Sequence, residues 1–401
     1  MSPVTRQSRE RKRVLHIATR FLHGGSERDL VEAIHALPGQ DYESCLLVGP
    51  EHNRELIGQM LPGTRVEVEP NLLREVSPSQ DIRAASSITR FIRRNRFDVV
   101  HTCQSKAGIV GRLAASVAGT PLILHSLSMA NIEHQRASMS MVYVGAERVA
   151  ARWTDAYFVV GTDLMQRYLR AGIADPARFQ VVRSSIDLTR FEEAAYLDRR
   201  DARERLGLPC GREVVAYVGS LEERKGVLRL PAYLRALRTF TEGSAHLVIA
   251  GVGPLEGELR ADFARQGLSD SVTFLGFTKE VPTVMAAADC LVLLSDAEGL
   301  PQVLVQAAAV RRPFVAFPID GAAELIWHGA TGSVLKHRDP VEAARATLQY
   351  LGPCEVRPVD LRDWSSAAVR QGYRQVFDAQ TARLADTSGH SLLRRRKGVT
   401  A

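Results

Sequence analysis

Short apolar runs alternate with longer amphipathic stretches along most of the chain. In the first half, the apolar runs span residues 13–19, 43–49, 97–103, 122–127 and 156–161. Runs that are apolar almost throughout are typical of strands buried on both faces, and the stretches between them have the period of helices. The pattern therefore predicts an α/β unit with a parallel sheet, ending near Ser185.

A second alternation follows a charged connector over residues 184–211. Its apolar runs span residues 213–220, 245–251, 272–277, 289–295 and 312–317. Two such halves predict two doubly wound, Rossmann-like domains that face each other across a cleft, with ligands at the carboxyl ends of the strands. We place the domains at 1–190 and 191–360, a C-terminal helix that packs back on the first domain at 361–385, and a disordered basic tail at 386–401.

Length and charge narrow the class of protein. The chain has 401 residues, of which 45% are hydrophobic and 24% charged, as expected for a soluble protein of two domains. The net charge of +7 is concentrated in both tails and in the segment 83–96. These cations form either solvated faces or a contact with an anionic membrane surface or substrate. Nucleic acid is disfavoured because no recognition module accompanies the charge.

Cysteines and apolar segments predict the compartment. The five cysteines are scattered and have no metal-ligand spacing, which favours reduced thiols in a cytoplasmic protein. The first residues lack the apolar core of a signal peptide, and no apolar run reaches the roughly 18–20 residues that span a bilayer. We expect a cytoplasmic protein, peripheral at most to the inner face of the membrane.

One carboxylate stands between an apolar run and the start of a helix. Glu298 follows the run 289–295, and a helix is expected from about Leu300. The N–H groups at a helix start, here those of Gly299 and Leu300, favour a phosphate, and the acid can reach a polar group attached to it.

Two cations and two glycines occupy matching positions in the two halves. Arg224 and Lys225 follow the first strand of the second half, where they can neutralise a diphosphate or form a solvated turn. Gly24 and Gly25 follow the first strand of the first half. They either let a ligand approach the backbone closely or form an ordinary turn.

Several side chains of the first half are candidates for an acceptor site. His101, Ser105 and Lys106 lie at one strand end, and His134 lies in a polar stretch. His101 and His125 belong to apolar runs, where a histidine is more often part of the core than a ligand.

Taken together, six segments resemble, in the same order, the motifs of retaining glycosyltransferases of family four. That family has the GT-B fold, and the resemblance is to its capsule and exopolysaccharide members in particular. These segments are LHIATRFLHGGSER, DVVHTCQSKAGIVGRLAA, GTDLMQRYLRAGI with VVRSSIDLTRF, VGSLEERKG, FLGFTKEVPTVMAAADCLVLLS and EGLPQVLVQAAAVRRPFVAF.

The resemblance implies transfer of a sugar from a nucleoside diphosphate sugar to a glycan, lipid-linked or natural-product acceptor, with retention and without a metal or cofactor. It assigns the first domain to the acceptor and the second to the nucleotide sugar. Lys225 and Arg224 would hold the diphosphate, and Glu298 would support the oxocarbenium-like transition state. The other residues implied on the donor side are Gly24, Gly25, Ser220, Phe277, Gly299, Leu300 and Gln306, and those on the acceptor side are Ser105, Lys106, His125, Ser128 and His134.

The chain departs from the family's pattern at several positions. Ser220 stands where the family usually has Arg, and Gln306 replaces the second acid. Ser128 replaces a histidine that contacts the donor sugar, and Ser185 replaces a glycine. These changes motivate an alternative, a non-catalytic GT-B protein that binds a nucleotide sugar or a partner transferase.

Two further hypotheses fit the sequence less well. The first is an epimerase or a phosphorylase with the same fold. An NAD-dependent oxidoreductase is least favoured, because the glycine-rich segment at Ala250 carries Pro254 where a phosphate-binding loop needs an N–H.

Overall fold

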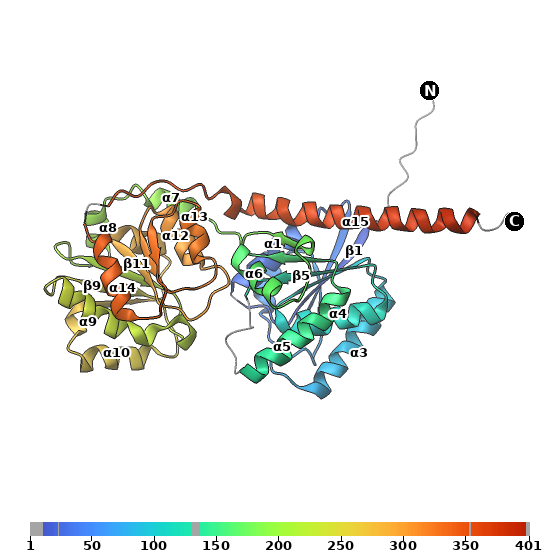
Figure 1. Cartoon of the computed structure of the whole chain (residues 1–401), viewed down its shortest axis with the longest axis horizontal. Helices are drawn as coiled ribbons and strands as arrows, with labels where there is room; N and C mark the ends of the chain where they lie inside the picture. The colour runs from blue at the N-terminus through green and yellow to red at the C-terminus, as the bar shows by residue number, and fades with distance from the viewer. Residues whose placement is uncertain (1–10, 23, 130–136, 353, 398–401) are drawn as a thin grey trace, which may run out of the picture. The chain divides into compact units, whose positions relative to one another are not determined.

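The computed structural model describes residues 11–22, 24–129, 137–352 and 354–397, except the side chains of 137–139 and 385–397. The chain forms two compact units (Figure 1). The first contains residues 1–185 and 366–401, and the second contains residues 186–365.

The first unit is built on a seven-stranded parallel sheet. Its strands are β1 (Lys12–Ala18), β2 (Tyr42–Val48), β3 (Arg65–Val68), β4 (Val99–Cys103), β5 (Leu122–Leu127), β6 (Ala156–Val159) and β7 (Phe179–Val181). They lie in the order β3-β2-β1-β4-β5-β6-β7. Neighbouring residues of a strand point to opposite faces, so Val14 and Leu15 enter different hydrophobic clusters. Both faces must therefore be covered by helices.

Helices cover both faces of this sheet. They are α1 (Gly25–His35), α2 (Arg54–Met60), α3 (Pro78–Asn95), α4 (Ser105–Ala118), α5 (Ala137–Ala150), α6 (Thr162–Arg170) and α15 (Ser366–Lys397). Apolar residues of α3 and α4 pack on the face of Leu15, and those of α1 and α15 pack on the face of Val14. The last helix of the chain thus completes the core of the first unit (Figure 1).

An ion pair fixes α15 at its beginning. Arg370 donates to the buried carboxylate of Glu32 on α1 at 2.5 Å, and the hydroxyl of Ser366 donates to the same side chain at 2.9 Å. Tyr373 and Phe377 of α15 are fully buried on the sheet. The helix continues to Lys397, past Asp386, where the sequence predicts the end of the ordered chain.

The second unit has a six-stranded parallel sheet in the order β10-β9-β8-β11-β12-β13. Its strands are β8 (Val214–Val218), β9 (His246–Ala250), β10 (Val272–Gly276), β11 (Cys290–Leu293), β12 (Phe314–Ala316) and β13 (Gly332–Val334). The helices are α7 (Thr189–Ala194), α8 (Arg199–Arg205), α9 (Leu230–Phe240), α10 (Glu256–Arg265), α11 (Val281–Ala287), α12 (Gln302–Ala309), α13 (Ala322–Trp327) and α14 (Pro340–Thr347). Residues of α9, α10 and α14 share one apolar core with the sheet.

Both sheets reverse their strand order at one point. The reversal lies between β1 and β4 in the first unit and between β8 and β11 in the second. Crossover connections leave in opposite directions there, so the loops that follow the two central strands open a crevice at the carboxyl edge. This topology confirms the prediction of two doubly wound α/β halves.

Three short strands were not predicted: β3, β7 and β13. Each has only three or four residues and lies at the edge of its sheet. An edge strand is partly exposed, so it carries polar residues and lacks the continuous apolar run by which the central strands were recognised. Among the described residues, no helix is long and apolar enough to cross a membrane.

A fully buried ion pair joins α4 to α5. Arg112 donates to both carboxylate oxygens of Glu147 at 2.8 Å, and both side chains have zero exposure. Arg112→Met should lower the free energy of unfolding by about 3–5 kcal/mol, because it leaves the Glu147 charge buried without its partner. Urea denaturation would measure the loss.

The double variant Arg112→Met with Glu147→Leu should regain most of this loss, since it removes both charges. Arg65→Met breaks an exposed ion pair with Glu67 and serves as the control, with an expected cost below about 1 kcal/mol. Equal losses in the single and double variants would show that packing by Arg112, and not its charge, is what α5 requires.

Candidate functional site

The loops that follow β8 and β11 bring two cations to one carboxylate. The ammonium of Lys225 donates to Glu298 Oε1 at 2.6 Å, and Arg224 donates to Oε2 at 3.4 Å and to the carbonyl of Ala297 at 2.8 Å. The Glu298 side chain is only 10% exposed, whereas that of Arg224 is 39% exposed. The structure thus gathers the three side chains to which the sequence assigned the chemistry.

A glycine allows the two loops to approach this closely. Gly226 follows Lys225 and has a φ of +65°. A Cβ at this position would lie 1.9 Å from the carbonyl oxygen of Leu294, at the end of β11. Only glycine combines this backbone conformation with such a contact. Gly226 therefore fixes the distance between Lys225 and the loop that carries Glu298.

A second ion cluster extends the same edge of the sheet. Arg229 forms two hydrogen bonds with the carboxylate of Asp296, at 2.9 and 3.0 Å. Arg338 donates to the carbonyl of Asp296 at 2.9 Å and lies 3.8 Å from its carboxylate. Together, the two clusters hold four cations and two carboxylates, so the clusters themselves carry an excess of positive charge. Such an edge suits an anionic ligand with more than one charge, such as a diphosphate.

The other residues that the sequence predicts on the donor side of the second unit lie after strands of this sheet or on α12. Phe277 follows β10 and is 77% exposed, and Gln306 is half-buried on α12. Gly299 and Leu300 are buried just before α12, which begins at Gln302, two residues later than the sequence predicts. Ser220 accepts a hydrogen bond from the hydroxyl of Tyr217 through its carbonyl oxygen at 2.9 Å, which holds the loop that leads to Arg224.

In the first unit, the glycine turn lies beside a buried acid. Gly24 precedes α1, and a Cβ there would lie 2.4 Å from Glu27 Oε2. Gln104, which follows β4 with a φ of +67°, accepts from the backbone N–H of Thr19 and Arg20. These contacts tie the loop after β1 to the end of β4 at the point where strand order reverses. Gly24 and Gly25 are both exposed there.

Sequence reasoning missed Asp29, which lies two positions after Glu27 on α1. Its side chain is buried, and Oδ2 accepts from Ser184 at 3.1 Å and from Ser128 at 3.3 Å. Within the described residues, Oδ1 has no hydrogen-bond partner. Burial raises the pKa of this carboxyl to about 7, and the two hydroxyls offset the effect only in part. The one signal in the sequence was an acid on the apolar face of an amphipathic helix.

The residues predicted on the acceptor side differ from one another in their contacts within the first unit. Lys106, on α4, is ion-paired with Asp81 at 2.5 Å and donates to the carbonyl of Glu75. Ser105 is the first residue of α4, and Ser128 is the half-buried partner of Asp29. His134 lies outside the described residues.

His125 is part of the core. It has no exposed surface, lies within hydrogen-bonding distance of Thr102, and packs against Tyr157. Burial and the nearby Arg112 charge lower its pKa well below the ordinary value. His101 is equally buried and bonds Ser126. Both rings therefore lie in the core of the first unit, where burial favours their neutral form.

Comparison with known protein families gives one assignment for each unit. A model described as "Glycosyl transferase 4-like domain" matches residues 24–184, and one described as "Glycosyl transferases group 1" matches residues 212–352. The second range contains the strand reversal between β8 and β11 and both ion clusters, and the first begins after β1 and contains α1 and β4.

Among characterised relatives, the UDP-Gal:alpha-D-GlcNAc-diphosphoundecaprenol alpha-1,3-galactosyltransferase of Escherichia coli is 25% identical over 334 residues. The alignment covers 82% of this chain and 84% of the relative. The D-inositol 3-phosphate glycosyltransferase of Mycobacterium bovis (strain BCG / Pasteur 1173P2) is 30% identical over 270 residues, or 64% of this chain. The match spans only 55% of that mycobacterial relative's length.

Solved structures support the fold. Anabaena Alr3699/HepE, in complex with UDP and glucose, aligns with a TM-score of 0.65 at 19% identity, over 94% of this chain and 98% of that one. WaaG, a glycosyltransferase involved in lipopolysaccharide biosynthesis, aligns with a TM-score of 0.64 at 15% identity, over 91% and 95%. The predicted GT-B class is confirmed.

Asp29 should make stability depend on pH. The pKa of about 7 in the folded state exceeds the ordinary value of roughly 4, so the folded state binds more protons than the unfolded state between these pH values. The free energy of unfolding should fall as pH rises from 4 to 7, by up to roughly 4 kcal/mol, and then level off. Asp29→Asn should remove this slope in urea titrations from pH 4.5 to 8.5.

Asp41→Asn is the matched control, because Asp41 is half-exposed and pairs with Arg374 in the same unit. It should keep the wild-type slope. Identical pH profiles for Asp29→Asn and the wild type would show that the Asp29 carboxyl does not stay protonated in the folded protein.

Proposed function

The chain is a glycosyltransferase of the GT4-like group, and on that premise we propose that it transfers a sugar from a uridine diphosphate sugar to a lipid-linked acceptor with retention of configuration. The observation that carries the donor side of this proposal is the contact of Lys225 and Arg224 with Glu298, at the carboxyl edge of the second sheet. The two cations supply charge for a diphosphate, and the acid lies within reach of the sugar attached to it.

The pairing suggests how the site accepts a donor. Lys225 is bound to Glu298 at 2.6 Å, and the arriving diphosphate competes for the same ammonium group. Phosphate oxygens that take over Lys225 and Arg224 release the Glu298 carboxylate for the hydroxyls of the sugar. The carboxylate then stabilises positive charge as the bond to the leaving phosphate breaks.

The proposed reaction balances without a strong protein base. The bond between the sugar C1 and the β-phosphate oxygen breaks, and the acceptor hydroxyl oxygen bonds to C1 on the same face. The acceptor proton passes to an oxygen of the leaving diphosphate, whose negative charge the cations stabilise. The products are the glycosylated acceptor and a nucleoside diphosphate. No divalent metal is needed, since Lys225 and Arg224 supply the positive charge.

Two findings on relatives support the choice of donor and acceptor. Structures similar to this chain contain UDP and UDP-glucose, and the Escherichia coli relative acts on a sugar linked to diphosphoundecaprenol. Arg83, Arg90, Arg93 and Arg94 are exposed on α3 of the first unit. These arginines provide a cationic surface for an anionic membrane in which a lipid-linked acceptor would reside.

Lys225→Ala should weaken binding of UDP by roughly 10–100-fold, because the diphosphate loses its most buried cation. Isothermal titration with UDP, GDP, ADP and dTDP would measure this, with EDTA and then with Mg²⁺. Selective binding of UDP, unchanged by Mg²⁺, is expected for the wild type. Arg265→Ala removes an exposed cation from α10 of the same unit and should bind UDP normally.

If all four nucleotides bind equally weakly, and Lys225→Ala changes nothing, the proposed donor site is wrong. Selective UDP binding without transfer to any acceptor would instead favour the alternative hypothesis, a non-catalytic GT-B protein that binds a nucleotide sugar. Ser128→His would then test whether the missing histidine is the reason for inactivity.

Glu298→Gln should lower kcat by about 10²–10³-fold with a smaller change in KM, because the carboxylate acts mainly on charge that develops in the transition state. Initial rates of UDP release in the presence of a sugar-diphosphate-lipid acceptor would measure the effect. An α-configured donor should give an α-linked product in the proton NMR spectrum. A β-linked product would exclude retention.

A further inference from the structure

A cavity of about 210 Å³ lies at the amino edge of the second sheet, opposite the edge that carries Lys225 and Glu298. Its walls come from the segment between α7 and α8, the residues before β11 and β12, and the segment after α14. A cavity needs a volume of only roughly 10–15 Å³ to hold a single water, so this one can hold a larger group. Its charged lining residues are Arg199, Arg311, Arg312 and Asp289.

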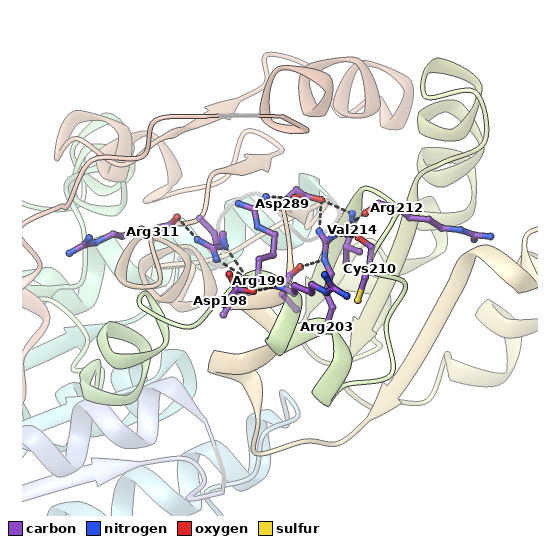
Figure 2. Close-up of polar contacts among 12 residues, drawn as sticks. Asp198, Arg199, Arg203, Cys210, Arg212, Val214, Asp289 and Arg311 are labelled. Atoms are coloured by element: carbon purple, nitrogen blue, oxygen red, sulfur yellow. Dashed lines mark hydrogen bonds and ion pairs between the residues drawn. The ribbon is translucent and has the colours of Figure 1, made fainter.

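Both carboxylate oxygens of Asp289 already accept hydrogen bonds. Its carboxylate accepts from Arg199 at 2.5 Å, from Arg203 at 2.8 Å, and from the backbone N–H of Val214 at 2.7 Å. Figure 2 shows Arg199 and Arg203 both reaching toward this one acid. One negative charge is therefore shared by two guanidinium groups, and it has little capacity left for the other arginines of the cavity.

Arg312 has no acid of its own among the described residues. Its guanidinium is half-buried and donates to the carbonyls of Ala286, at 2.8 and 3.3 Å, and of Arg311, at 3.2 Å. Burial, followed by the Arg199 charge, lowers its pKa to about 10, and the nearby Asp289 carboxylate offsets this effect only in part. A half-buried cation held only by neutral oxygens beside another cation is electrostatically costly, and an anion in the cavity would relieve that cost.

Arg311 is held in place beside the cavity. It has a φ of +54°, its guanidinium stacks on the ring of Tyr196 at 5.0 Å, and it donates to the Tyr196 hydroxyl at 3.1 Å. The positive φ closes the end of α12, where the N–H of Arg311 donates to the carbonyl of Ala308 and that of Arg312 to the carbonyl of Ala307. A guanidinium that is already ordered loses less entropy when it binds a ligand.

We propose that this cavity is an anion site for a phosphate group, with Arg311, Arg312 and Arg199 as its cations. Guanidinium groups match the paired oxygens of a phosphate, and here Arg199, Arg311 and Arg312 line the same cavity as a single, already neutralised acid. The group arrives either as a free phosphate or pyrophosphate or as the headgroup of a phospholipid. The site lies at the end of the sheet remote from the proposed donor diphosphate and does not depend on it.

The test uses the full-length chain carrying Lys225→Ala, which removes the most buried of the cations at the opposite edge. Titration with inorganic phosphate and pyrophosphate should give saturable binding. Arg311→Asn in this background should weaken that binding at least tenfold, and asparagine tolerates the positive φ at this position. Arg265→Ala, which removes an equal charge from α10, should leave the binding unchanged. Arg312→Gln, checked for folding by circular dichroism, is the second variant.

A second experiment, with lipid vesicles, distinguishes a free phosphate from a phospholipid headgroup. Flotation with vesicles that contain phosphatidic acid compares Arg311→Asn with Arg265→Ala, so that the loss of overall charge is the same in both. Saturable binding of the soluble anions, lost in Arg311→Asn, supports a free phosphate. Reduced flotation of Arg311→Asn without binding of the soluble anions supports a lipid headgroup. Equal behaviour of Arg311→Asn and Arg265→Ala in both experiments overturns the proposal.

Discussion

The ion pair between Lys225 and Glu298 depends on how the second sheet is wound. The two residues lie 73 positions apart, yet their side chains meet at 2.6 Å because β8 and β11 are neighbours where strand order reverses. The loops after these strands enter the same crevice, and Gly226 lets them approach without a steric clash. The surrounding cations and the start of α12 are arranged around this contact, so the proposed donor chemistry depends on it.

The first sheet reverses in the same way but presents a different chemistry at its edge. There the loops after β1 and β4 are joined by Gln104, and the acids of α1 point into the protein. Glu32 holds the start of α15, whereas Asp29 lies beside two hydroxyls and has one oxygen without a hydrogen-bond partner in the described structure. One short helix thus carries a structural acid and a titratable acid. The substitution of Ser128 for the family's histidine lies in direct contact with the second of these.

The two edges of the second sheet both concentrate cations, for different reasons. At the carboxyl edge, Lys225 and Arg229 are balanced by nearby carboxylates that a ligand can displace or use. At the amino edge, a single acid is shared by Arg199 and Arg203, and within the described part of the chain Arg312 donates to backbone oxygens alone. Charge without a counter-charge is costly in a half-buried cavity, and that cost is the physical basis for expecting an anion there.

The sequence by itself determined the alternation of strands and helices and the two doubly wound halves, because central strands and glycine loops leave local patterns, and it predicted the proposed roles of Glu298, Arg224 and Lys225. It did not show the edge strands β3, β7 and β13, whose residues are too few and too exposed to form an apolar run. Only the tertiary structure decided that His125 is a core residue, that Asp29 is buried with a raised pKa, and that Arg312 has no ion pair with an acid among the residues the structure describes. Each of these properties depends on contacts between segments far apart in the chain, and burial and charge pairing are set by those contacts alone.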